Sequence, residues 1–181
     1  MKIRLAIGLL ALLLTVSAAA QAQNQWQQKV NDELPLMGHR NWIVIVDSAY
    51  PLQTSPGIET IETNSDHLAV MDFVMQSLQT SKHVRPIVHL DKELEFLSDS
   101  DAPGIGHYRD ELKQHLHGLP ADSVLHEKLI EQLNQTGNMF HVLVLKTTMT
   151  IPYTSVFVQL DCQYWSAESE AKMRALMKVA K

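Results

Sequence analysis

The sequence predicts one α/β domain, a three-layer α/β/α arrangement with helices on both faces of a mainly parallel, partly mixed sheet. Apolar, strand-like runs alternate along the chain with segments of helical periodicity, which is the pattern of layered α/β domains. The last two strand-like runs, residues 140–147 and 153–162, are joined by only five residues, which suggests that the sheet is not purely parallel. The 181 residues are enough for one domain with a sizeable core.

The first half of the chain supplies two expected helices and three expected strands. A short amphipathic helix over residues 25–34 ends near Pro35. Asp66 starts the second helix, which extends to residue 81 and repeats Leu and Met on one face. The expected strands cover residues 42–49, 58–63 and 85–94.

The second half supplies three further helices and the two closing strands. We expect helices over residues 107–118 and 123–137, because each periodic segment ends in a glycine. The strands at 140–147 and 153–162 follow. The tail, residues 167–181, has acidic residues first and basic residues last, as the helix dipole favours. It is therefore expected to form an additional C-terminal helix.

Residues 1–22 have the layout of a secretory signal peptide. Lys2 and Arg4 precede an apolar run, and the small residues that follow permit cleavage after Ala20 or Ala22. The run is short for a membrane span, and a retained N-terminal anchor is the alternative. We therefore expect a mature domain of residues 23–181 that is periplasmic or secreted, with no membrane attachment after cleavage.

Charge and residue usage argue against several classes of function. The net charge of −5 is mild and scattered, so we expect no nucleic-acid partner. The single cysteine, Cys162, cannot form an internal disulfide and lies in an expected strand. Nine histidines suggest a metal, but the pairs His115/His117 and His83/His89 have loose spacing and no HExxH motif is present. We expect no cofactor and no dedicated metal site, with most histidines solvated.

Polar side chains flank two of the expected strands. His39 precedes and Asp47 follows the apolar run at residues 42–46. Tyr153 and Ser155 stand at the start of the last strand. Loops at strand ends are where α/β sheets bind ligands. An imidazole, a carboxylate and hydroxyl groups around one pocket suit a small polyhydroxylated ligand, so we expect the two ends of the strand to supply one pocket.

Three blocks of the sequence resemble the ribose pyranase and fucose mutarotase family. Gly-His at residues 38–39 and Asp-Ser-Ala-Tyr-Pro at residues 47–51 are similar to the family's Gly-His, apolar strand and Asp-Ala-x-x-Pro. LKTTMTIPY at residues 145–153 is similar to the family's Ile-Arg-Thr-Gly-Glu-x-x-Pro-Tyr. Leu-His-Glu at residues 125–127 resembles its Thr-His-Glu helix start. The resemblance extends over roughly residues 34–160.

This resemblance implies a monosaccharide ligand and a homo-oligomer that has its pockets at subunit interfaces. The implied activity is the interconversion of ring forms or anomers of a free sugar by general acid–base catalysis, without a cofactor. By position, the resemblance makes His39 the proton donor and makes Asp47 and His126 sugar contacts. Tyr153 and Ser155 take the places of the family's Tyr-x-Asn.

The chain also departs from the family's pattern. Ser155 replaces an asparagine, Thr-Thr-Met at residues 147–149 replaces Thr-Gly-Glu, and the signal peptide and the C-terminal helix are additions. The reaction nevertheless needs only proton transfers, for which the ordinary histidine pKa near 6.5 is suitable. Two alternatives stay open: a non-catalytic exported module that binds a sugar or another small polar ligand in the same pocket, and, less favoured, a histidine-based metal-binding protein.

Overall fold

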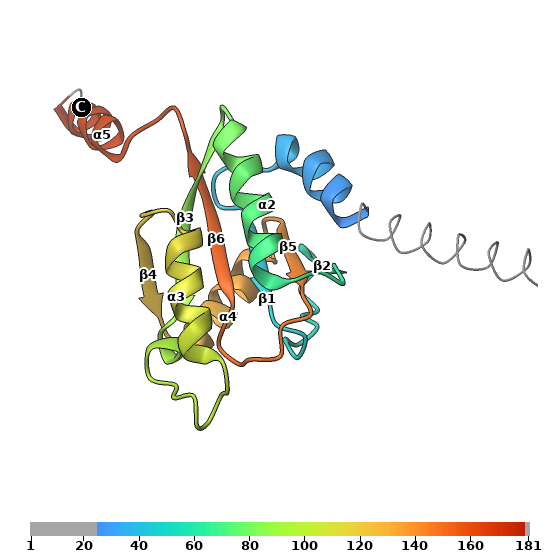
Figure 1. Ribbon diagram of the computed structural model, residues 1–181. Coiled ribbons are helices and arrows are strands. Elements are labelled where there is room, and N and C mark those ends of the chain that lie inside the picture. The colour runs from blue at the N-terminus through green and yellow to red at the C-terminus, as the bar shows by residue number, and fades with distance from the viewer. Residues whose placement is uncertain (1–24, 180–181) are drawn as a thin grey trace, which may run out of the picture.

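A computed structural model of the protein describes residues 25–179 (Figure 1). The expected signal peptide at residues 1–22 lies outside the described residues. Within residues 25–179, no helix combines the length and the apolar character that crossing a bilayer requires.

The described chain forms helices and strands in an alternating order. An N-terminal helix over residues 25–33 leads into a short 3-10 helix. The elements then follow as η1 (Leu34–Leu36), β1 (Trp42–Val46), β2 (Ile58–Glu62), α2 (His67–Thr80), β3 (Val84–Asp91), η2 (Lys92–Glu95), α3 (Ile105–His115), β4 (Ala121–Val124), α4 (His126–Thr136), β5 (Val142–Lys146), β6 (Val156–Cys162) and α5 (Ala167–Val179).

The six strands form one mixed sheet in the order β2-β5-β1-β6-β3-β4. The pairs β1–β5, β2–β5 and β3–β4 are parallel. β6 lies between β1 and β3 and runs antiparallel to both. The predicted fold class is therefore confirmed, and the closing strand is the one that makes the sheet mixed.

Helices cover both faces of the sheet, and the two faces have separate cores. Ile43 and Ile45 of β1 point into the core that the N-terminal helix, α2 and α3 cover. Trp42, Val44 and Val46 point to the opposite face, where α4 covers them. In Figure 1, α2 and α3 lie in front of the sheet and α4 lies behind it. All five residues of β1 are buried, because a strand covered on both faces is apolar throughout rather than alternating.

Several element boundaries differ from those that the sequence predicts. The expected helix over residues 123–137 begins only at His126, because residues up to Val124 form the edge strand β4 against β3. The expected strand at residues 85–94 ends at Asp91 and turns into η2. Four polar or small residues cannot show a strand pattern of their own, so pairing with β3 decides the structure of β4.

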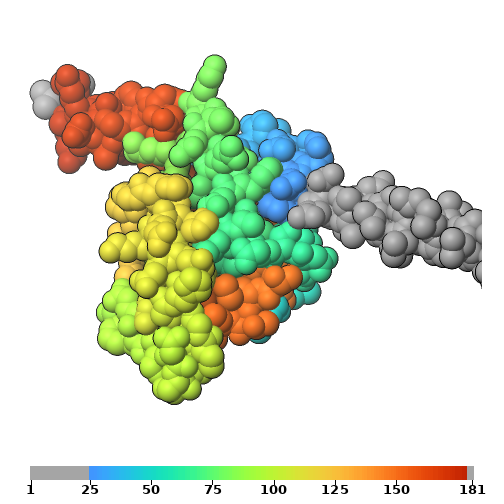
Figure 2. Space-filling model, viewed as in Figure 1, coloured from blue at the N-terminus to red at the C-terminus, as the bar shows by residue number. Residues whose placement is uncertain are grey.

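The last helix, α5, projects from the rest of the molecule (Figures 1 and 2). It follows β6 after a short connection and confirms the helix expected near residues 167–181. Neither core includes any residue of α5. The sheet and the other helices therefore form the domain, and α5 is an appendage to it.

Candidate functional site

A polar cluster lies at the edge of the sheet where β1, β3 and β5 end and where β6 and α4 begin. Asp47 directly follows β1, and His126 is the first residue of α4. Tyr153 and Ser155 lie just before β6. The imidazole of His126 meets the Tyr153 ring edge-to-face, with 5.5 Å between ring centroids, and the Asp47 charge acts on His126. Four of the five predicted site residues therefore come together.

A buried carboxyl group fixes the His126 ring. Nδ1 of His126 lies 2.9 Å from Oδ1 of Asp91, and the Asp91 side chain is fully buried. An ionised carboxylate only accepts hydrogen bonds, so the ring proton belongs on Nδ1 and Nε2 is left for other contacts. The main-chain N–H of His126 also donates to the Glu93 carboxylate, at 3.1 Å from Oε2. Both the ring and the start of its helix are thus held by β3 and η2.

Burial and charge change the acidity of both members of this pair. The hydrogen bond to Asp91 raises the pKa of His126 above its ordinary value, against the effect of partial burial, and the charges of Glu93 and Asp47 add to the rise. Burial raises the pKa of the Asp91 carboxyl, while the hydrogen bond from His126 and the backbone N–H of Ser155 oppose that rise. His126 is therefore a stronger base than a free imidazole.

Aromatic rings enclose the imidazole of His126. The rings of Tyr50, Tyr153 and Phe157 all stand edge-to-face to it, with centroid distances of 6.3, 5.5 and 6.4 Å. Tyr50 is buried and its hydroxyl donates to Oε1 of Gln53 at 2.9 Å. Tyr153 is partly exposed. Such a surround excludes bulk water from most of the imidazole and leaves Tyr153 at the open side.

The turn before β6 is held tightly in place. The hydroxyl of Tyr108, in α3, donates to the Thr154 carbonyl at 2.8 Å. Tyr153 has φ 57, the left-handed conformation, which is disfavoured by about 1–2 kcal/mol in a residue with a side chain. Ser155 is fully buried, and neither its Oγ nor Oδ2 of Asp91 has a hydrogen-bond partner among the described residues. Residues with a strained backbone, such as Tyr153, are concentrated at functional sites.

His39 lies at the opposite end of the sheet. It precedes β1, whereas Asp47 follows it, and β1 alone spans about 16 Å at roughly 3.3 Å per residue. His39 is exposed and borders a cavity of about 560 Å³ whose lining includes Arg85, Asp161 and Arg174. The expectation that both strand ends supply one pocket is therefore wrong within a single chain, because an extended strand keeps its two ends apart.

Asp91 is the residue of this cluster that the sequence reasoning missed. The sequence did contain a signal for it, because Asp91 closes an apolar strand as Asp47 does. The expected strand at residues 85–94 ran past it and hid its position at the strand end. The contact with His126 joins residues that are 35 positions apart, and no local pattern reveals such a contact.

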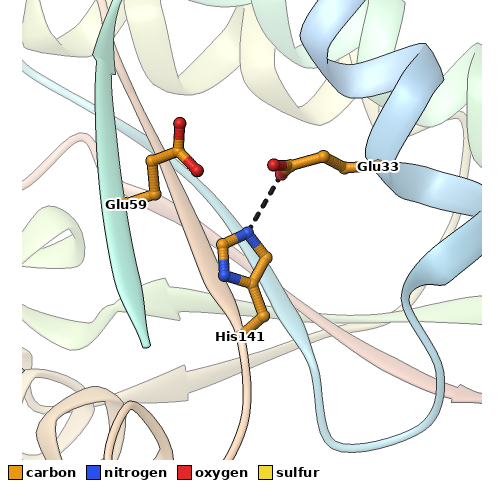
Figure 3. A group of neighbouring side chains, drawn as sticks. All are labelled: Glu33, Glu59 and His141. Carbon is orange, nitrogen blue, oxygen red and sulfur yellow. Dashed lines mark hydrogen bonds and ion pairs between the residues drawn. The ribbon is translucent and has the colours of Figure 1, made fainter. Parts of the chain in front are cut away.

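One group of side chains has the donor types of a metal site (Figure 3). Glu33, Glu59 and His141 have ligand atoms within 4.8 Å of one another. However, Nζ of Lys29 lies 2.7 Å from Glu33 and 2.8 Å from Glu59, and Nε2 of His141 lies 3.0 Å from Oε2 of Glu33. The lysine ammonium thus already provides the positive charge between the two carboxylates, and the group ties the N-terminal helix to β2.

The histidines are less solvated than the sequence predicts. His67, at the start of α2, is fully buried, and Nδ1 lies 3.1 Å from Oγ1 of Thr147. Burial lowers the pKa of His67 to about 4. His115 lies 2.8 Å from Asp72. The prediction of solvated histidines is therefore wrong for both, because carboxylates and hydroxyls distant in the sequence partner them.

The fold resembles solved sugar-binding proteins. Bacillus subtilis RbsD complexed with D-ribose matches with a TM-score of 0.53 and 15% identity, over 74% of this chain and 91% of that chain. The fold is that of RbsD. The RbsD fold thus confirms, at the level of structure, the resemblance given by the sequence motifs.

Two other solved structures are also similar. The fucose mutarotase of Streptococcus pneumoniae in complex with L-fucose matches with a TM-score of 0.49 and 20% identity, over 72% of this chain and 89% of that chain. FucU from Bifidobacterium longum matches with a TM-score of 0.49 and 16% identity, over 74% and 94%. No protein-family model and no curated protein matches the sequence.

Proposed function

We propose that this chain is an exported member of the ribose pyranase and fucose mutarotase family that interconverts the ring forms or anomers of a free monosaccharide. The observation that carries the proposal is the imidazole of His126, which Asp91 orients and Tyr153 borders, at the carboxyl end of the strands in an RbsD fold. Ligands bind at this edge of open α/β sheets. The motif around Asp47 lies at the same edge.

The reaction requires two proton transfers and no net change in protonation. A cyclic sugar opens when its anomeric hydroxyl loses a proton while the ring oxygen gains one. The bond between the anomeric carbon and the ring oxygen breaks, and the anomeric carbon becomes a carbonyl. Nε2 of His126 is placed to take the hydroxyl proton, because Nδ1 is committed to Asp91. His39 is the proton donor to the ring oxygen. Closure through the same or another hydroxyl reverses both transfers and gives an anomer or another ring size.

The sugar's other hydroxyl groups need acceptors and donors. Asp47 is half-buried and can accept hydrogen bonds through its carboxylate, although Oδ1 already accepts from the Ala49 N–H at 2.8 Å. The hydroxyl of the partly exposed Tyr153 can donate and accept, whereas the hydroxyl of Ser155 is fully buried in a single chain. Apolar faces of sugar rings also pack well against aromatic side chains such as Tyr153. These residues bind and orient the sugar in the proposal.

A second copy of the chain must supply His39, since one chain holds it at the other end of the sheet. Because His39 and His126 lie at opposite ends of each chain, such a contact between copies is head-to-tail. The cavity beside His39 is lined by Arg40 and by two ion pairs, Arg85–Asp161 and Arg174–Glu170, each at 2.6 Å. Head-to-tail contacts close into a ring when the rotation between neighbouring copies closes. The proposed pocket is therefore shared between neighbouring subunits of a homo-oligomer.

A binding module is the second candidate, and the same separation of His39 from His126 favours it. A monomer would keep the sugar-binding residues and lack the proton donor. Exchange NMR across common pentoses and hexoses, starting with D-ribose and L-fucose, distinguishes the two. Exchange between ring forms faster than in buffer supports the enzyme, while saturation transfer from the protein without faster exchange supports the module.

Export is also part of the proposal, supported by the basic residues, apolar run and small residues at positions 1–22. Mass spectrometry of the protein from the producing cell tests it. A mature chain that begins at Gln21 or Gln23 is the expected result. An intact Met1 in the membrane fraction would show that the apolar run is an anchor.

A further inference from the structure

Helix α5 presents an apolar face that nothing in the described chain covers. Met173, Leu176 and Met177 are 37%, 65% and 60% exposed. Together with Trp165 and Ser169 they line a groove of about 500 Å³ along one side of the helix. Their spacing of three and four residues puts them on one stripe. This stripe, defined here as the α5 face, projects with the helix from the body of the molecule (Figures 1 and 2).

Local contacts fix the start of α5 without covering its apolar face. The Oγ of Ser166 accepts a hydrogen bond from the Ser169 N–H at 3.1 Å, which caps the helix. Nε1 of Trp165 donates to Oε2 of Glu170 at 2.8 Å, and Arg174 pairs with Glu170 at 2.6 Å. A helix of this length is marginal in water on its own, and packing of an amphipathic face is the usual source of its stability. We therefore expect another apolar surface to pack on the α5 face.

The charge pattern of α5 indicates which partner fits. The first turn carries Glu168 and Glu170, and the last turn carries Lys178. An identical helix laid antiparallel on the α5 face brings the acidic start of each helix to the basic end of the other and also opposes the two helix dipoles. A parallel arrangement would place like charges and like dipole ends together. The pattern thus complements itself in the antiparallel direction.

We infer that α5 pairs with the α5 of a second copy of this chain, antiparallel and around a two-fold axis at Met173. Met173 is the midpoint of Ala167–Val179. Full overlap of the two helices then places Ser169 opposite Met177 of the second copy, because both are four residues from the midpoint. In such an isologous contact the same patch serves both partners. The pairing is independent of the sugar chemistry, and it uses the side of α5 that carries Met173, whereas Glu170 and Arg174 of the same helix line the cavity beside His39.

Cysteine cross-linking in the full chain tests the geometry, in a Cys162→Ser background that removes the single native thiol. Met173→Cys lies on the two-fold axis and should form a disulfide-linked dimer about tenfold faster than Ala175→Cys, because pairing raises the effective thiol concentration. Ala175 is exposed on the opposite side of the helix and is the matched control. Equal rates for the two variants would overturn the proposal.

The direction of the pairing has its own test. In the antiparallel pair, two Ser169→Cys chains hold their thiols about 12 Å apart along the helix axis, too far for a disulfide. A mixture of Ser169→Cys with Met177→Cys should cross-link, and Ser169→Cys alone should not. Rapid cross-linking of Ser169→Cys to itself would establish a parallel pair and contradict the inference.

A solution measurement separates the dimer from the other possible occupant, a lipid surface. Leu176→Glu should lower the mass found by light scattering, whereas Lys172→Glu, at the border of the same groove, should leave it nearer to that of the parent. Co-sedimentation of the parent with phosphatidylglycerol vesicles, abolished by Leu176→Glu and accompanied by an unchanged mass, would overturn the proposal in favour of a membrane contact.

Discussion

The two ends of β1 hold their polar side chains in different ways. At the carboxyl end, the buried Asp91 fixes His126 at 2.9 Å, and aromatic rings surround the imidazole. At the amino end, His39 is exposed, and a cavity lined by charged residues from β3, β6 and α5 lies beside it. The carboxyl end thus holds its imidazole in one orientation, whereas the amino end presents an imidazole outward. We expect sugar interconversion to need one end of each kind, from two copies of the chain.

The largest expected effect on the rate of sugar interconversion comes from replacing the exposed His39. His39→Ala should slow sugar interconversion by about 10²–10⁴-fold, the usual contribution of a positioned proton-transfer group. Sugar affinity should change much less, since Asp47 and Tyr153 are untouched. Exchange NMR at saturating sugar measures the rate, and His107→Ala, which removes another exposed histidine, is the control. A parent rate in His39→Ala would mean that the outward imidazole is not the proton donor.

His67, a buried histidine near the carboxyl end of the strands, should affect the stability of the fold and not the sugar chemistry. His67 keeps a pKa of about 4 in the folded chain, below its ordinary value near 6.5 in the unfolded chain. Unfolding therefore takes up a proton between these values, and the free energy of unfolding should fall by about 3 kcal/mol as the pH is lowered from 6.5 to 4. Well above pH 6.5 the imidazole is neutral in both the folded and the unfolded chain, so this group then contributes no pH dependence.

Urea denaturation at a series of pH values measures that contribution. His67→Asn retains a donor toward Thr147 and does not titrate, so its free energy of unfolding should fall less over the same interval. Identical pH dependence in the parent and the variant would show that His67 is not a buried neutral histidine.

Replacing the buried carboxylate of Asp91 should have a smaller effect on sugar interconversion than replacing His39, but a larger effect than replacing Asp47. Asp91→Asn should slow interconversion by about 10–100-fold, because a hydrogen bond to a charged group contributes about 1.5–3 kcal/mol. It should also lower the pKa of His126, whose raised pKa rests first on that hydrogen bond. An NMR titration of the His126 ring without sugar detects this shift even if the chain has no catalytic activity. An unchanged pKa would contradict the orienting role of Asp91, and Asp91→Glu is the charge-retaining control.

The smallest expected effect is the loss of sugar affinity on replacing Asp47 at the carboxyl end of β1. Asp47→Asn should weaken sugar binding by about tenfold, because a neutral amide replaces a charged acceptor. The exchange rate at saturating sugar should stay near that of the parent. Binding is measured by saturation-transfer NMR or calorimetry. If the variant binds sugar normally but no longer speeds exchange, Asp47 takes part in proton transfer and not in sugar binding.

Much of the fold could be predicted because its signals are local. The five apolar residues of β1 need a cover on both faces, and Asp66 caps α2 by accepting from the Ala69 N–H at 3.1 Å. The closing pair of strands predicted that the sheet is not purely parallel, although β6 pairs with β1 and β3 and not with β5, the strand before it in the chain. β4 could not be predicted, because its residues Ala121–Val124 carry no strand pattern and depend on the neighbouring β3.

The site was only partly predictable, for a similar reason. Asp47, His126, Tyr153 and Ser155 lie in motifs or at strand ends, and the structure does bring them together. Asp91 depends on a contact across the chain to His126, so sequence spacing could not reveal it. The separation of His39 from this cluster follows from the extended strand between them, and only the three-dimensional arrangement shows that one chain cannot join the two ends.

The most direct test of the split pocket is complementation between two inactive variants. His39→Ala and His126→Ala are each produced alone and then together, so that mixed assemblies form. In a randomly mixed ring about one quarter of the interfaces join an intact His39 to an intact His126. The mixture should therefore recover about that fraction of the parent's exchange rate. A mixture that assembles by light scattering, yet exchanges sugar no faster than the sum of the two variants, would contradict a pocket shared between copies.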